Sequence, residues 1–111
     1  MSKTVTFSFD NNVTIHVNDS KCSNHFIRGS KCERMFRSVH AYLILNKIIK
    51  NNIIDLGAYV GDNAIPWSKM TNDLIYAIDP SEENCEYIST ISKLNDISNI
   101  TVINKAISDK P

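Results

Sequence analysis

The chain has 111 residues, of which 42% are hydrophobic and 22% charged, a composition typical of one soluble globular domain. Twelve Lys and Arg balance twelve Asp and Glu, so the chain lacks the positive charge typical of proteins that bind nucleic acids or anionic membranes. No apolar stretch approaches the roughly 20 residues that cross a bilayer, and the first residues do not resemble a secretory signal, so we expect a cytoplasmic protein without membrane or nucleic-acid partners.

Residues 1–31 are expected to form an N-terminal hairpin and a loop. Apolar side chains alternate with polar ones before and after Asp10-Asn11-Asn12, which supplies turn residues. This alternation predicts two strands within residues 4–17, with one apolar face. Residues 18–31 are mostly polar, and we expect them to connect the hairpin to the rest of the chain.

The apolar pattern changes to helical spacing from about Cys32 to Lys50, and Asn51-Asn52 ends the predicted helix. Short apolar runs then alternate with helical segments. The predicted strand, helix, strand, helix and strand are Ile53–Leu56, Ala64–Met70, Leu74–Ile78, Glu82–Leu94 and Ile100–Asn104. This order predicts an α/β fold, with a β-α-β-α-β parallel sheet covered on both faces and preceded by the hairpin and a helix.

Two of the three glycines, Gly57 and Gly61, directly follow the first strand of this run. Glycine reaches backbone angles that a Cβ forbids and lets a ligand approach the main chain closely. Pro66 fits only the opening turn of a helix, which places the helix start near Asp62 or Asn63. Free N–H groups at such a start favour a carboxylate or phosphate. The structural alternative is that the glycines only make a tight turn.

An acid, Asp79, ends the next predicted strand, 22 residues after Gly57. In a parallel pair of strands its carboxylate lies beside the glycine turn, where it can accept both ribose hydroxyls of a nucleoside-containing cofactor. Pro80 and Ser81 then end the strand and begin the next helix. Asp55 lies on an otherwise apolar strand, so its charge should be bound to a ligand, to backbone N–H groups, or to both.

The dinucleotide pattern G-x-G-x-x-G does not fit, because Tyr59 and Asp62 stand where its second and third glycines would be. The pattern D-x-G-x-x-x-G at residues 55–61, followed by Asp79, resembles instead the first two motifs of Rossmann-fold methyltransferases that use S-adenosylmethionine. The resemblance implies that residues 32–111 are the N-terminal half of such a domain.

Three segments look like the cofactor-binding half of FkbM-type methyltransferases: NIIDLGAYVGDN (52–63), YAIDPSEEN (76–84) and NITVINKAISD (99–109). This resemblance implies methyl transfer to an oxygen nucleophile of an acceptor that the sequence does not identify. No catalytic base can be named. The implied cofactor contacts are Asp55, Gly57, Ala58 and Gly61 at the methionine end, Asp79 at the ribose, Pro80 and Ser81 beside the adenosine, and Ala106 to Asp109 near the adenine. A side chain at Gly61 is expected to occupy cofactor space.

A complete fold of this class has seven strands, so we expect the chain to be a truncated form that lacks the substrate half. The strand at Ile53–Leu56 would then be an exposed apolar edge that recruits a second copy or another chain. One alternative is a non-catalytic remnant that binds the cofactor or a partner chain. Another is an unrelated nucleotide-dependent enzyme, which would bind NAD instead.

Other residues receive structural interpretations. Trp67 is expected to pack in the core rather than to stack on adenine. Zinc-binding types of side chain occur at Cys22, His25, Cys32 and His40. Their spacing contains no tight C-x-x-C pair, so no metal site is expected.

Overall fold

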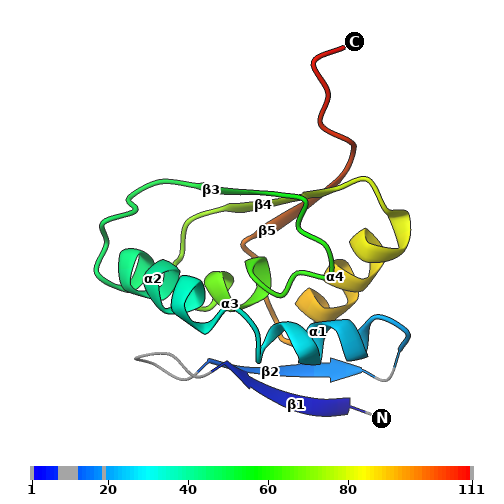
Figure 1. Cartoon of the computed structure of the whole chain (residues 1–111), viewed down its shortest axis with the longest axis horizontal. Helices are drawn as coiled ribbons and strands as arrows, with labels where there is room; N and C mark the ends of the chain where they lie inside the picture. Colours follow the sequence, from blue (N-terminus) through cyan, green and yellow to red (C-terminus); the bar gives the residue numbers. More distant parts are fainter. Residues whose placement is uncertain (1, 8–12, 19, 111) are drawn as a thin grey trace.

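The computed structural model describes residues 2–7, 13–18 and 20–110, and it shows a two-stranded antiparallel hairpin and a three-stranded parallel sheet with helices between them (Figure 1). This arrangement confirms the predicted α/β class. In chain order the elements are β1 (Ser2–Phe7), β2 (Val13–Asn18), α1 (Ser23–Gly29), α2 (Arg34–Leu45), β3 (Ile53–Leu56), α3 (Ala64–Ser68), β4 (Ile75–Asp79), α4 (Glu82–Leu94) and β5 (Ile100–Asn104).

The hairpin has the predicted apolar face. Strands β1 and β2 pair antiparallel, with Val5 opposite Ile15 and Phe7 opposite Val13, and these four side chains are buried. The predicted turn at residues 10–12 lies outside the described residues. Asn95 at the end of α4 exchanges two hydrogen bonds with the main chain of His16, at 2.8 and 2.7 Å, and thereby fixes the hairpin to the helical layer.

Helix α1 corrects the prediction that residues 18–31 form a loop. Phe26 is fully buried, and its ring lies edge-on to Phe7 with 5.6 Å between centroids. Cys22 is also buried, at the position that precedes the helix. So few apolar residues give a weak periodicity, and a helix this short is stable only because it packs against the hairpin.

Helix α2 is shorter than predicted and exposes the face that its apolar pattern suggested would be buried. It ends at Leu45 rather than near Lys50, and the N–H groups of Ile48 and Ile49 turn back to the carbonyl of Leu43. Its buried residues are Arg37, Ala41 and Ile44. The apolar residues Met35, Phe36, Val39 and Tyr42 are 50% to 80% exposed, because no described element covers them.

The parallel sheet has the order β3-β4-β5, and β3 lies at its edge, as expected. Ile75 and Ala77 are fully buried on the side of the helices, whereas Ile54 and Leu56 on the other side are 62% and 58% exposed. Figure 1 shows the helices and the hairpin on one side of the sheet. The prediction that helices cover both faces is therefore wrong for the described chain.

Helix α4 has the predicted bounds, and Ser81 caps it by accepting a hydrogen bond from the main-chain N–H of Asn84 at 3.3 Å. Helices α3 and α4 lie between the parallel sheet and the hairpin and share one core with both. Within the part of the chain that the structure describes, no helix is long and apolar enough to cross a membrane.

Candidate functional site

The turn between β3 and α3 has the backbone that its glycines suggest. Gly57, Tyr59 and Gly61 all have positive φ angles, of 71°, 55° and 86°. The N–H groups of Gly57 and Ala58 both donate to the carbonyl of Ile78, at 2.8 and 2.9 Å, so the turn is fixed to the end of β4. Strand, turn and helix are contiguous, as predicted.

The two glycines of this turn have different surroundings. A Cβ built on Gly57 would meet no atom within 4 Å, so Gly57 borders open space. A Cβ on Gly61 would lie 3.0 Å from side-chain atoms of both Ile65 and Ile88. Gly61 therefore lets the turn pack closely against α3 and α4, and the expectation that its missing side chain makes room for a cofactor is wrong. Open space borders Gly57 instead.

Asp79 lies at the end of β4 with its carboxylate against the turn. It is 6% exposed, and Oδ2 accepts a hydrogen bond from the N–H of Tyr59 at 2.8 Å. Oδ1 accepts from the N–H of Ser81 at 2.9 Å and from the amide of Asn84 at 3.2 Å. A carboxylate can accept about four hydrogen bonds, so these three donors leave room for about one more. The structure thus brings Asp79 to the turn, while its role toward a ribose stays a prediction.

Asp55 carries the unsatisfied acceptor of the site. Its Oδ2 is buried and has no hydrogen-bond partner among the described residues, so the backbone donors considered for it do not reach this oxygen. Burial raises the pKa of Asp55 from 3.8 to about 6, with further contributions from the negative charges of Asp62 and Asp79, while Arg37 opposes the shift. A buried oxygen without a donor is costly, and a ligand that donates a proton to it would remove this cost.

The remaining predicted cofactor contacts differ in how close the structure places them to the turn. Ala58 is 2% exposed and its side chain belongs to the core, so only its main chain borders the turn. Pro80 is exposed and Ser81 half-buried, next to Asp79. Ala106 and Asp109 are exposed in the segment after β5, which leads away from the rest of the molecule in Figure 1. The structure does not bring these last two residues to the turn.

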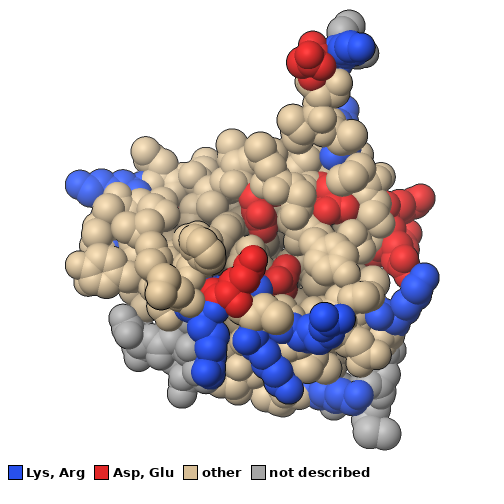
Figure 2. Space-filling view, in the orientation of Figure 1, with Lys and Arg blue, Asp and Glu red and all other residues tan. Residues whose placement is uncertain are grey.

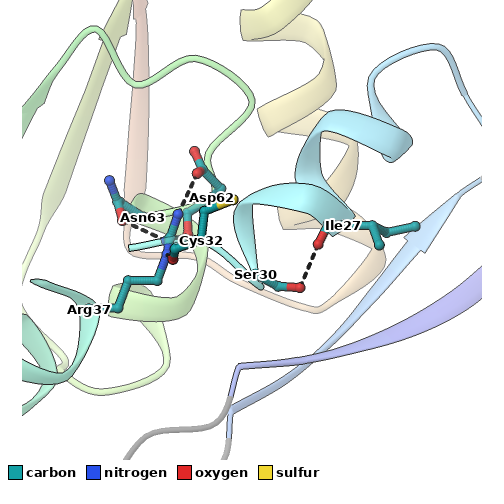
Figure 3. Close-up of polar contacts among 6 residues, drawn as sticks. All are labelled: Ile27, Ser30, Cys32, Arg37, Asp62 and Asn63. Carbon is teal, nitrogen blue, oxygen red and sulfur yellow. Dashed lines mark hydrogen bonds and ion pairs between the residues drawn. The ribbon is translucent and has the colours of Figure 1, made fainter. Parts of the chain in front are cut away.

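Sequence reasoning missed Arg37, the buried cation of α2, which is only 4% exposed. Its guanidinium donates to the carboxylate and the carbonyl of Asp62 and to the side chain of Asn63, all at 2.7 Å (Figure 3). Its Nε donates to the carbonyl of Cys32 at 2.9 Å. The available signal was the spacing of Arg37 from Ala41 and Ile44, which places the three residues on one helix face.

Two structural interpretations can be compared with the packing. Trp67 is partly buried against the core, as predicted, and its ring lies edge-on to His40 at 5.3 Å between centroids. Tyr59 is 42% exposed, with its ring 5.7 Å from that of His25. In the described ranges, no three His, Cys, Asp or Glu side chains gather as a set of metal ligands.

The parallel sheet, with a glycine turn after its first strand and an acid at the end of its second, defines a partial Rossmann-like methyltransferase fold. A solved structure described as StiE O-MT, residues 961–1257, is similar to this chain with a TM-score of 0.51 and 15% sequence identity. The similarity covers 87% of this chain and 39% of that one, so this chain spans well under half of the relative. No protein-family profile and no curated protein matches the sequence.

Proposed function

We propose that this chain binds S-adenosylmethionine at the turn between β3 and α3, as the cofactor-binding part of a cytoplasmic FkbM-type methyltransferase that acts on an oxygen nucleophile. The observation that carries this proposal is the meeting of the Asp79 carboxylate with the glycine turn, through the 2.8 Å bond from the N–H of Tyr59. The similarity to an O-methyltransferase segment supports the class of fold.

The residues at the turn fit this cofactor in two respects. The open space beside Gly57 gives access to the main chain of the turn. The unpartnered Oδ2 of Asp55 can accept a hydrogen bond from an ammonium group, and ionised Asp55 would attract its charge. A buried acceptor and an unobstructed glycine therefore lie two residues apart on the chain, an arrangement that fits a molecule with a methionine end.

Within this proposal, each residue acts by binding or orienting. Asp55 would hold the ammonium group of the methionine end, Asp79 would accept from the ribose, and Pro80 and Ser81 would border the adenosine. When bound, S-adenosylmethionine supplies a methyl group on a sulfonium, which is already activated for transfer. Alignment of the acceptor can then supply most of the acceleration, so the proposal needs no catalytic base on this chain.

Isothermal titration of the chain with S-adenosylhomocysteine, and in parallel with NAD, tests the proposal. We expect saturable binding of S-adenosylhomocysteine and none of NAD. Preference for NAD would instead support an unrelated nucleotide-dependent enzyme. Glu86→Ala, on the exposed side of α4, is a matched control for Asp79→Ala because it also removes one acid.

A non-catalytic cofactor-binding or partner-binding chain is the second candidate. The observation that favours it is the open edge and face of the sheet, where Ile54 and Leu56 are more than half exposed. This candidate predicts binding of S-adenosylhomocysteine without methyl transfer from labelled S-adenosylmethionine to any acceptor. It also predicts a change in oligomeric state, measured by analytical ultracentrifugation, when Leu56 is replaced by Lys.

A further inference from the structure

The chain has no formal net charge, but its N-terminal and C-terminal parts carry opposite net charges. Residues 1–50 contain eight of the twelve Lys and Arg, whereas residues 51–111 contain nine of the twelve Asp and Glu. Figure 2 shows a row of Lys and Arg along the side of α1 and the hairpin, and acidic side chains around a hollow above it. The two regions therefore carry opposite net charges, and charged side chains of one can pair with those of the other.

Arg37 makes such a contact in the interior. Three of its side-chain hydrogen bonds end on Asp62 and Asn63, the last two residues before α3, and another ends on Cys32 in the connection from α1 to α2 (Figure 3). The guanidinium also lies over the ring of Phe7 on β1, 5.5 Å from its centroid. This side chain of α2 thus joins the turn to the hairpin and to the connection between α1 and α2.

Gly29 shows how closely the N-terminal part approaches the same carboxylate. A Cβ on this last residue of α1 would lie 2.5 Å from Oδ2 of Asp62, the oxygen that pairs with Arg37. Because there is no room for a side chain at Gly29, the main chain of α1 lies close to the carboxylate that Arg37 binds. The end of the turn is therefore confined by the N-terminal helices.

We propose that Arg37 is a positioning residue for the turn at residues 57–63: its guanidinium fixes Asp62 and Asn63, and its charge balances the acids that face the site. The role in ligand binding rests on the proposed function, whereas the fixing of the turn does not. In this proposal the N-terminal hairpin and helices support the ligand-binding turn and are not a separate structural unit.

The electrostatic part of this role concerns Asp55. The charged groups that act on it are Asp62 in the turn, Asp79 on β4 and Arg37 on α2, and of these only Arg37 favours the ionised carboxylate by lowering the pKa of Asp55. Loss of the Arg37 charge would therefore raise the pKa of Asp55 further. An ammonium-bearing ligand binds ionised Asp55 best, so its affinity should rise with pH as Asp55 ionises.

Three variants distinguish the hydrogen bonds by which Arg37 fixes the turn from the effect of its charge on Asp55. Arg37→Lys keeps the charge but cannot make the forked set of hydrogen bonds, and Arg37→Gln loses both. Arg34→Gln removes an exposed cation from the same helix and is the control. We would measure affinity for S-adenosylhomocysteine by isothermal titration between pH 5 and 8, and amide hydrogen exchange at residues 57–63 without ligand.

We expect Arg34→Gln to bind like the wild type, and both Arg37 variants to bind at least about 10-fold more weakly. The midpoint of the pH dependence should stay in place for Arg37→Lys and move to higher pH for Arg37→Gln, an effect that a merely structural residue would not produce. If Arg37→Gln does not fold, Asp62→Asn provides the second test, because loss of that negative charge should move the midpoint to lower pH.

Wild-type affinity and an unchanged midpoint in folded Arg37→Gln would overturn the ligand-binding part of the proposal. If the wild type itself does not bind S-adenosylhomocysteine, the proposed function fails, and hydrogen exchange still decides the role of Arg37. Exchange at residues 57–63 should be at least about 10-fold faster in Arg37→Lys than in Arg34→Gln. Equal exchange in these two variants would refute the fixing of the turn.

Discussion

Replacing Asp55 by Asn should stabilise the protein at pH 8 but change its stability little at pH 4. The folded state raises the pKa of this carboxyl from 3.8 to about 6, chiefly by burial. Between these values the folded chain keeps a proton that the unfolded chain has released, so the free energy of unfolding falls as pH rises through this window. At about 1.36 kcal/mol for each pH unit, the rise of the Asp55 pKa from 3.8 to about 6 corresponds to up to about 3 kcal/mol of folding stability, and this stability is fully lost above pH 7.

Urea denaturation followed by circular dichroism at both pH values measures this effect, provided that the m-values agree. The difference in free energy of unfolding between Asp55→Asn and wild type should be below about 1 kcal/mol at pH 4 and up to about 3 kcal/mol in favour of the variant at pH 8. Asp109→Asn, which removes an exposed carboxylate after β5, should follow the wild type at both. A wild type as stable as Asp55→Asn at pH 8 would refute the reasoning.

Three further predictions concern the turn and the first helix. Asp79→Ala should weaken binding of S-adenosylhomocysteine about 10- to 150-fold in isothermal titration, whereas unchanged affinity would remove Asp79 from the site. Gly61→Ala should lower the melting temperature, because its Cβ would lie 3.0 Å from side-chain atoms of Ile65 and Ile88. Gly57→Ala should mainly weaken ligand binding, because its Cβ would extend into open space beside the turn. The positive φ of Gly57 adds about 1 to 2 kcal/mol of backbone strain to this variant. The reverse pattern in calorimetry and titration would contradict these assignments. Phe26→Ala should cost about 3 to 5 kcal/mol in denaturant unfolding, since Phe26 is fully buried, and a loss below about 1 kcal/mol would argue against the packing of α1.

The elements with strong local signals were predictable from the sequence. Helix α4 has the predicted bounds and begins directly after Ser81, and β3, β4 and β5 coincide with their apolar runs to within a residue. The glycine turn and Asp79 were also found, because parallel pairing alone brings the carboxyl ends of neighbouring strands together. These features depend on residues close in the chain or on a single topological rule.

The features that sequence reasoning missed depend on contacts between distant segments. Phe26 signals a helix only once Phe7 packs against it, and Arg37 is buried only because Asp62 and Asn63 pair with it. Charged residues are rarely buried, so the hydrophobic pattern alone does not indicate that Arg37 faces the interior. The run IIDL in β3 likewise cannot distinguish a strand covered on two faces from one covered on a single face.

The most direct test of the central claim is a residue-resolved map of ligand binding. In a ¹⁵N-labelled sample titrated with S-adenosylhomocysteine, the amide signals of residues 57–61, Asp79 and Ser81 should shift most, since the structure brings these two segments together through the 2.8 Å hydrogen bond from the N–H of Tyr59 to Asp79. Shifts confined to other parts of the chain, or none at millimolar ligand, would contradict a cofactor site at this turn.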